Sequence, residues 1–473
     1  MIADLKPYPE YKDSGLPWVE ELPQGWIVRR GRGVFESIDV RSKTGKEELL
    51  TVSSQDGVRL RSSKAVTMFQ AKSYVGHKLC WPGDLVVNSL WAWATGLGFS
   101  RHYGIVSTAY GVYRPRDEHK AKWRFLDYLL RSYAYKWEFQ TRSRGIWISR
   151  LQLTDWYFFD MPILLPPEED AEAIVRFLDH ANAKIDRYVR AKKKLIKLLN
   201  EQKQAIIHRA VTRGLDPNAP LKDSGIPMLG QIPDDWKTIP IKRVATVLNG
   251  FAFSSEIYTD SGVPLIRIGD VKSSGTVDIE HAVKLPGGFL ASHSFVEIKN
   301  GDLVMAMTGA TIGKVAKYSH DCPSLLNQRV CAFRCLSGRV VQEYLFLLLS
   351  SQLYLQQVLM ACYGGAQPNI SDTTLAGFKM PIAPFDLQKE IVSSVVRETR
   401  SLTAAITHAE REIELLNEYR TRLVADVVTG KLDVREAAEV LPEELVVESD
   451  GADSTDETDL SDDADEVLQE EES

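Results

Sequence analysis

Short segments in both halves of this chain carry polar, basic and aromatic side chains of the kinds that read nucleic acid. Arginine can donate two hydrogen bonds to guanine and the amide of Asn or Gln can pair twice with adenine, while Lys and Thr suit phosphate oxygens. In the first half the candidates are Trp91, Arg101, His102, Arg142, Arg144 and Trp147. In the second half they are Thr308, Thr311, Lys314, Asn327, Gln328, Arg329, Gln367, Asn369 and Ser371. Taken as sets in short loops, they predict contacts to base edges and phosphates.

These segments lie between runs that have the pattern of strands and helices. Short β-branched and aromatic runs, bounded by Gly, Asp and Ser, predict strands. The expected strands include residues 49–53, 84–89, 110–114, 264–268 and 302–307. Amphipathic spacing predicts one helix at 123–139 and another at about 340–361, each followed by a candidate loop.

Four segments of the first half return in the same order in the second half. The matching pairs are 13–17 with 223–227, 83–86 with 301–304, 161–163 with 380–382, and 211–216 with 428–433. An internal repeat has to be recognised before the local elements, because it decides the whole fold. The blocks between the matching segments differ, which favours one scaffold that carries two different contact surfaces.

Two stretches have helical spacing long enough for helices of roughly 40 residues, or about 60 Å. Each begins after a Pro-rich turn and ends near a glycine, Gly214 in the first copy and Gly430 in the second. Tyr188 and Leu195 also fall on the apolar spacing of the first helix. The expected seam positions of a coiled coil are Leu178, Ile185, Leu199, Ile206, Val395, Leu402, Leu416 and Leu423. Each helix would expose a row of apolar side chains if it stood alone. The simplest way to bury both rows is for the two helices to pack against each other as an antiparallel pair, although each helix could instead pack on its own domain.

The composition is that of a globular protein with a strongly acidic end. The chain has 473 residues, and its formal net charge is −7. Residues 443–473 hold 15 of the 64 acidic residues and no Lys or Arg, so the remainder carries 57 basic against 49 acidic residues. We expect this tail to be disordered and solubilising, with mimicry of nucleic acid as the alternative. No long apolar run or signal-peptide pattern is present, which predicts a cytoplasmic protein without membrane contact.

Several familiar catalytic patterns fail on inspection of their residues. Residues 309–315 resemble a phosphate-binding loop but are one residue short and lack the metal-binding Ser or Thr. Asp234 and Asp235 stand in a segment that resembles a nuclease carboxylate cluster, yet adjacent carboxylates do not fit that site and the repeat partner has none. The nine His and five Cys have no paired spacing for zinc or a catalytic triad. We therefore predict no catalytic or metal site.

The order of segments in residues 8–440 resembles the specificity subunit of Type I restriction–modification enzymes. The resemblance rests on the duplicated frame and on the run Gly-Ala-Gln-Pro-Asn-Ile-Ser at 365–371, followed by Met-Pro-Ile at 380–382. The first half lacks the Gln-Pro-Asn core around residues 145–149, and the acidic tail lies outside the family pattern.

The resemblance implies an α+β fold. Two mixed α/β target recognition domains would be joined by a pair of long antiparallel coiled-coil helices with pseudo-two-fold symmetry. The implied domains are 1–160 and 221–380 for recognition, 161–220 and 381–441 for the helices, and 442–473 for the tail. Such a subunit is not catalytic and has no cofactor of its own. It would bind double-stranded DNA at a split asymmetric site, two methyltransferase subunits that use S-adenosylmethionine, and motor-nuclease subunits that use ATP and Mg.

Two other functions remain open from the residues alone. A coiled-coil adaptor without DNA recognition would show no salt-dependent binding to duplex DNA. A divergent nuclease would cleave DNA in a metal-dependent way, and substitution of Asp234 or Asp235 would abolish the cleavage.

Overall fold

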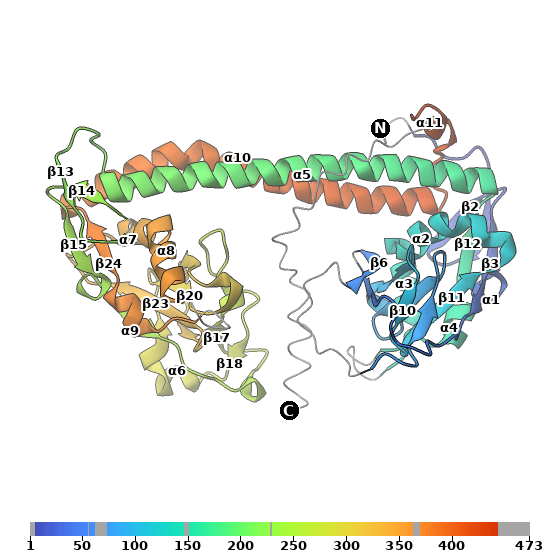
Figure 1. Ribbon diagram of the computed structural model, residues 1–473, viewed down its shortest axis with the longest axis horizontal. Helices are drawn as coiled ribbons and strands as arrows, with labels where there is room; N and C mark the ends of the chain where they lie inside the picture. Colours follow the sequence, from blue (N-terminus) through green and yellow to red (C-terminus); the bar gives the residue numbers. More distant parts are fainter. Residues whose placement is uncertain are drawn as a thin grey trace. The chain divides into compact units, whose positions relative to one another are not determined.

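The computed structural model describes residues 5–54, 56–61, 73–145, 151–227, 229–362 and 369–442. They form a mixed α+β structure that divides into two compact units (Figure 1). Unit 1 comprises residues 1–190 and 413–473, and unit 2 comprises residues 191–412. Two long helices, α5 (Glu168–Arg213) and α10 (Phe385–Val428), each contribute one segment to both units. The predicted α+β class and the two long helices are confirmed.

Unit 1 is built on a four-stranded antiparallel sheet whose strands have the order β4-β11-β8-β9. The central strand β8 alternates its side chains between two apolar clusters. Leu85 and Val87 pack with the helices of the unit, whereas Val86 packs with Val52 and Val58 of a β-hairpin. Burial on both faces explains why this strand is a continuous apolar run. The strands of this sheet are β4 (Phe35–Ser37), β8 (Leu85–Asn88), β9 (Leu97–Phe99) and β11 (Tyr110–Pro115).

Unit 2 contains a four-stranded antiparallel sheet with the corresponding order β16-β23-β20-β21. Its central strand β20 is likewise buried on both faces, with Met305 in one apolar cluster and Val304 in the other. A second four-stranded sheet, in the order β18-β17-β22-β19, packs beside the second cluster. The strands are β16 (Ala245–Asn249), β17 (Val263–Ile266), β18 (Lys284–Leu285), β19 (Glu297–Ile298), β20 (Leu303–Ala306), β21 (Val315–Lys317), β22 (Ser324–Leu326) and β23 (Val330–Cys335).

Short strand pairs and helices complete each unit. In unit 1 these are β1 (Tyr11–Leu16), β2 (Val19–Pro23), β3 (Ile27–Arg30), α1 (Gly31–Val34), β5 (Leu50–Ser53), β6 (Gly57–Leu60), β7 (Lys78–Cys80), β10 (Gly104–Val106), α4 (Asp155–Asp160), β12 (Pro162–Leu165) and α11 (Arg435–Glu439). In unit 2 they are β13 (Leu221–Asp223), β14 (Gln231–Pro233), β15 (Lys237–Pro240), α6 (Phe289–Ser292), α9 (Asp372–Gly377) and β24 (Lys379–Ile382).

The amphipathic helix predicted in each half is in fact a pair of helices. The spacing predicts one helix at residues 123–139, but α2 (Trp123–Arg131) ends before Ser132 and α3 (Tyr133–Arg142) follows it. In unit 2, α7 (Gln342–Leu349) and α8 (Gln352–Ala361) replace the predicted helix 340–361 and are separated at Ser351. Both serines have extended backbone and donate their hydroxyl to a carbonyl three residues earlier, at 2.7 Å and 2.6 Å. The apolar residues keep a helical spacing on both sides of the serine, so the sequence pattern could not show that the helix is interrupted there.

Within each unit the segments of α5 and α10 pack side by side. In unit 2, Lys192 pairs with Glu412 at 2.7 Å and Arg209 pairs with Glu398 at 3.0 Å. Residue numbers rise along one segment as they fall along the other, so the segments of this unit are antiparallel. In unit 1, Leu423 packs in the same apolar cluster as the α5 residues Leu178 and Ala181.

The predicted seam positions differ in how deeply they are buried. Leu178, Ile185, Val395 and Leu423 are buried, and Leu199, Ile206, Leu402 and Leu416 are half-buried. The α5 spacing was wrong at Tyr188 and Leu195, which are 52% and 41% exposed. Lys192 occupies the packed side of α5 instead, because Glu412 satisfies its charge. The left-handed glycines predicted at the two helix ends are confirmed, with φ of +75° at Gly214 and +77° at Gly430.

Within the described ranges, no single helix is long and apolar enough to cross a membrane. The pair α7 and α8 reaches the required length and composition only when joined across a bend of 56°. Tyr344, Leu345 and Leu348 of α7 are buried in the apolar core of unit 2.

Candidate nucleic-acid interface

Three loops of unit 2 meet at one end of its central sheet. Thr308, just after β20, forms an antiparallel backbone bridge with Asn369. The amide of Met307 donates to the carbonyl of Arg329 at 2.9 Å, and the amide of Ile370 donates to the carbonyl of Met307 at 3.2 Å. Sequence segments about 20 and 60 residues apart are thereby held side by side by backbone hydrogen bonds.

The side chains that these loops present suit hydrogen bonding to base edges. Gln328, Arg329 and Asn369 are exposed, and Thr308 and Asn327 are half-buried. The carboxamide oxygen of Asn327 accepts a hydrogen bond from the Arg329 amide at 3.4 Å, which leaves its NH₂ group to donate elsewhere. Three side-chain amides and one guanidinium at one end of the sheet supply both of the fork-like pairings that recognise adenine and guanine.

Ser371 has a local structural role next to this cluster. Its hydroxyl accepts a hydrogen bond from the amide of Thr374 at 3.2 Å and caps the N-terminus of α9. Ser371 thus helps to hold the loop, and its contact with DNA stays a prediction. The predicted contact residue Gln367 lies outside the described residues.

The glycine-rich loop at 309–314 is a tight connection between two strands. Gly309 and Gly313 have φ of +70° and +80°, and the Gly313 amide donates to the carbonyl of Ala306 at 3.0 Å. Strand β21 follows the loop directly, so no helix N-terminus is available to hold a phosphate there. Lys314 is half-buried, and the Thr311 hydroxyl is buried without a hydrogen-bond partner among the described residues. The backbone of Lys314 returns to the end of β20, where its carbonyl accepts a hydrogen bond from the Ala306 amide at 3.1 Å.

In unit 1 the predicted residues fall at two opposite ends of the sheet. Trp91 follows β8, is 36% exposed, and stacks on Trp93 at 5.8 Å between ring centroids. Arg101 and His102 follow β9, whose end is bonded to the start of β8 through Ser100 and Asp84. Because β8 and β9 form an antiparallel hairpin, residues close in sequence are carried apart. The structure does not bring Arg101 and His102 together with Trp91.

Arg144 lies on the same side as Trp91, whereas Arg142 is engaged elsewhere. Arg144 exchanges two backbone hydrogen bonds of 2.9 Å with Gln152, and the next residue, Leu153, donates its amide to the carbonyl of Ser89 beyond β8. The guanidinium of Arg142 instead bonds Glu138 at 2.5 Å and Asp160 at 3.2 Å. Arg142 thus belongs to an internal ion-pair network, and its role in base reading stays a prediction. Trp147 lies outside the described residues.

An aromatic cluster beside the unit 2 loops was missed from the sequence. Phe251 forms a parallel backbone bridge with Asn327, and its ring is 41% exposed. His293 and Phe295 approach that ring at centroid distances of 5.1 Å and 5.9 Å. The close spacing of Phe251 and Phe253 in the sequence could have indicated an aromatic cluster. The rings that complete it, His293 and Phe295, come from a segment about 40 residues away and could not be found from local spacing.

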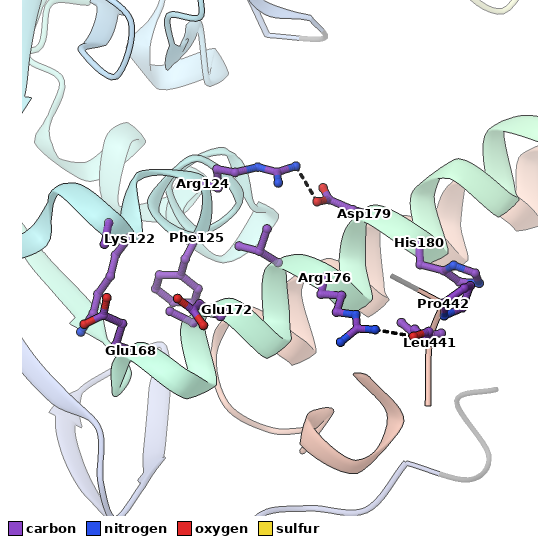
Figure 2. Close-up of a pocket in the computed structure, with 13 residues that line it drawn as sticks. Lys122, Arg124, Phe125, Glu168, Glu172, Arg176, Asp179, His180, Leu441 and Pro442 are labelled. Carbon is purple, nitrogen blue, oxygen red and sulfur yellow. Dashed lines mark hydrogen bonds and ion pairs between the residues drawn. The ribbon is translucent and has the colours of Figure 1, made fainter. Parts of the chain in front are cut away.

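The cavity shown in Figure 2 lies in unit 1 and contains none of the predicted contact residues. Its volume is about 420 Å³, and it lies between α2, the start of α5 and residues 441–442. Arg124 pairs with Asp179 at 2.5 Å, and Arg176 donates to the carbonyl of Leu441. Its labelled side chains include both basic and acidic residues (Figure 2), so no single charge sign dominates the wall. In the described part of the chain, no group of three or more His, Cys, Asp or Glu residues has the geometry of a metal site.

The cysteines are free thiols. Burial raises the pKa of Cys80 to about 12 and that of Cys335 to about 11. Thiols with such high pKa values are poor nucleophiles at neutral pH. Cys80 and Cys331 are buried, Cys335 and Cys362 are half-buried, and Cys322 is exposed.

Comparison with known proteins identifies relatives for both units. Residues 233–415 match the Type I restriction modification DNA specificity domain. The Type I restriction enzyme MjaVIII specificity subunit of Methanocaldococcus jannaschii is 27% identical over 282 residues, which cover 59% of this chain and 64% of that protein. The chain therefore spans less than two thirds of that relative. A second relative from the same organism is 21% identical over 459 residues, or 90% of this chain and 98% of the relative.

A solved chain gives an independent match to the fold. It comes from work on complex assembly and conformational transition of the type I R-M system, and it superposes with a TM-score of 0.56 at 17% identity. The match covers 87% of this chain and 99% of the solved chain. The predicted resemblance to Type I specificity subunits is confirmed, and the adaptor and nuclease alternatives gain no support.

Proposed function

We propose, from a chain that carries the DNA specificity domain of Type I restriction–modification systems, that each unit recognises one part of a two-part DNA sequence. The observation that carries this proposal is the three-loop cluster of unit 2, which lies inside residues 233–415. The cluster gathers Asn327, Gln328, Arg329 and Asn369 at one edge of a rigid sheet. A sheet edge with convergent amides and guanidinium groups is suited to the major groove, where each base pair presents a distinct pattern of donors and acceptors.

Unit 1 would read a different sequence with the same scaffold. Its central sheet has the same strand order as that of unit 2, and a loop after the equivalent strand carries Trp91 and meets the Arg144 segment. The side chains at the matching positions differ between the units. We interpret the chain as an internal duplication in which the framework is kept and the loop ends specify the bases.

The two long helices would form an antiparallel pair that sets the gap between the two halves of the site. Within unit 2 the ion pairs Lys192–Glu412 and Arg209–Glu398 are consistent with that arrangement. A stiff spacer holds a fixed distance, which a flexible linker does not. The relevant distance for two readers of one duplex is about one helical turn or a multiple of it.

The chain would not be catalytic alone and would act through partners. Relatives named as specificity subunits of restriction enzymes support this part of the proposal. Two methyltransferase subunits would supply S-adenosylmethionine and flip the target adenine out of the duplex. Motor-nuclease subunits with ATP and Mg would join for restriction. The acidic segment 443–473 would remain a solubilising extension.

The decisive experiment exchanges only the block that carries the unit 2 loops. Residues 236–380 are replaced by the equivalent block of a related protein, and methylated adenines are mapped across the host genome for the natural and the exchanged chain. One half of the methylated sequence should change while the other half and the gap remain the same. A change in both halves together, or a host methylation pattern that does not depend on this chain, would contradict the proposal.

A further inference from the structure

Two arginines of unit 1 lie over neighbouring aromatic residues of the short helix α4. The guanidinium carbon of Arg32 is 5.9 Å from the ring centre of Trp156, and that of Arg144 is 5.4 Å from the ring centre of Tyr157. Arg32 comes from α1 and Arg144 from the loop after α3, so distant segments converge on α4. Trp156 is 69% exposed, which is unusual for the largest aromatic side chain.

Cationic charge is in excess around this helix. Asp160, at the end of α4, pairs with three arginines: Arg30 at 3.3 Å, Arg32 at 3.2 Å and Arg142 at 3.2 Å. Arg116 adjoins the same group because its Nε donates to the carbonyl of Arg32 at 3.1 Å. Arg142 also pairs with Glu138, so the ion pairs at this place join three arginines to two carboxylates.

The geometry keeps these charges available to an external anion. The side chains of Arg30 and Arg32 are 56% and 60% exposed. A guanidinium stacked on an aromatic ring uses its face for that contact and keeps in-plane N–H groups free to donate. Such an edge matches the paired oxygens of a phosphate. Trp156 fixes the direction of Arg32, which lowers the entropy that binding would otherwise cost.

The arginines adjoin the candidate interface of unit 1. Arg144 is bonded through its backbone to Gln152, and Leu153 is bonded to Ser89, at the start of the loop that contains Trp91. The same place in unit 2 is different. Helix α9 has Thr373 and Thr374 where α4 has Trp156 and Tyr157, when the two helices are matched by their buried residues Phe158 and Leu375. The aromatic and arginine pairs are therefore particular to unit 1.

We propose that Arg32, Arg144 and Trp156 form a phosphate-binding strip by which unit 1 grips the DNA backbone beside the bases that it reads. This inference rests on the proposed function and changes the role of Arg144 from base reader to backbone contact. Among the described residues, the loops that carry Trp91 and Arg144 hold one side-chain amide, Gln152, whereas the unit 2 cluster holds three. Unit 1 would therefore obtain more of its affinity from phosphate neutralisation. Phosphate contacts position a protein on the duplex without carrying sequence information.

The test measures DNA binding of the full-length chain as a function of salt. A fluorescent duplex with the methylated sequence found in the host, and a second duplex with an unrelated sequence, are titrated from 50 to 300 mM NaCl (about the range over which phosphate contacts are screened). For Arg32→Gln and Arg144→Gln, the slope of log K against log[salt] should become shallower by about 0.9 for each phosphate that the variant no longer neutralises. Affinity should fall by a similar factor on both duplexes. Trp156→Ala should weaken binding in the same direction with a smaller change in slope, because it removes support and no charge.

Two control variants distinguish phosphate binding by the strip from a general effect of the protein's net charge on DNA binding. Arg187→Gln removes one exposed arginine from α5 in the same unit and should leave the slope as in the natural chain. Arg32→Lys keeps the charge but loses the fork of donors, so its slope should be retained while its affinity falls. Thermal unfolding of each variant establishes that unit 1 is folded.

Each contrary outcome has its own meaning. Unchanged slopes for Arg32→Gln and Arg144→Gln, in a chain that still binds DNA, would overturn the strip alone. A changed methylated sequence in Arg144→Gln would make Arg144 a base reader and would also overturn it. A natural chain that shows no salt-dependent binding to either duplex would overturn the proposed function together with the strip.

Discussion

Arg334 donates two parallel hydrogen bonds to Asp302, from Nε to Oδ1 at 3.0 Å and from Nη2 to Oδ2 at 2.6 Å. Asp302 is buried and follows Gly301, whose φ of +100° turns the chain into β20. The same relationship joins Arg114 and Asp84 in unit 1, with distances of 2.7 Å and 2.9 Å. In each unit one ion pair thus fastens the entry of the central strand to the strand beside it.

The first prediction concerns the stability of unit 2. Asp302→Asn should destabilise this unit, because Arg334 would keep its charge beside a neutral amide. Breaking a buried pair costs about 3–5 kcal/mol, and since the Arg334 side chain is 35% exposed we expect a loss of about 2 kcal/mol. Urea unfolding measures the loss, and Asp260→Asn at an exposed site should change stability by less than about 0.5 kcal/mol. Equal effects of the two substitutions would show that the pair contributes nothing.

The second prediction concerns sequence reading by unit 2. Arg329→Ala and Asn369→Ala should each weaken binding to the methylated sequence, with a loss of discrimination of about 1–3 kcal/mol for each base pairing removed. Their affinity for an unrelated duplex should change much less. Asn300→Ala is the matched control, because Asn300 lies before the turn at the other end of β20 and pairs with Asp321. Equal losses on both duplexes would mean that these side chains do not read bases.

The third prediction separates loop support from DNA contact at Ser371. Ser371→Ala removes the N-cap of α9 and should lower stability by about 1 kcal/mol. Ser371→Asp should restore that stability, since a carboxylate also caps a helix and interacts favourably with its N-terminus. The methylated sequence should be the same in both variants. A changed sequence in Ser371→Asp, with stability restored, would show that Ser371 is a contact residue.

The fourth prediction concerns the pH dependence of unit 1. Burial is the main cause that lowers the pKa of His119; Glu118 opposes the shift, and Lys122 and Arg29 add to it. The unfolded chain, with a histidine pKa of about 6.5, therefore takes up a proton before the folded chain does. Stability from neutral His119 should be complete above that value and should be lost as the pH falls below it. Thermal unfolding between pH 8 and 5 measures the loss.

A pair of substitutions tests the role assigned to His119. His119→Gln should make the stability of unit 1 less dependent on pH over this range. His408→Gln is the control, because the His408 side chain is 78% exposed and belongs to the unit 2 segment of α10. A pH dependence that His119→Gln leaves as steep as before would assign the effect to another group.

The sequence predicted α10 better than α5 for a physical reason. Along α10 the packed positions are mostly apolar, so Val395, Leu402 and Leu423 mark the correct face. Along α5 the packed face includes Lys192, which pairs with Glu412 on a helix more than 200 residues away. The apolar spacing therefore assigned Leu195 to the packed face of α5, although its side chain is 41% exposed. A partner from a distant segment cannot be read from local spacing.

The candidate interface was predictable as a list of residue types but not as an arrangement. The approach of Thr308 to Asn369 depends on backbone pairing between loops. The hairpin of β8 and β9 separates Trp91 from Arg101, although the two are only ten positions apart in the sequence. The engagement of Arg142 by Glu138 did have a local signal, because the two residues are four apart on one helix.

The double burial of β8 and β20 has a consequence for how such a protein can diversify. A strand covered on both sides tolerates little change, since its apolar side chains face one packed layer or the other. Ser89 and Met307, which directly follow the two strands, are still buried, but the next residues, Leu90 and Thr308, are exposed and half-buried. From there on the loops can change without rebuilding either layer. New preferences for DNA can then arise by exchange of a few loop residues, while the architecture that presents them is inherited intact.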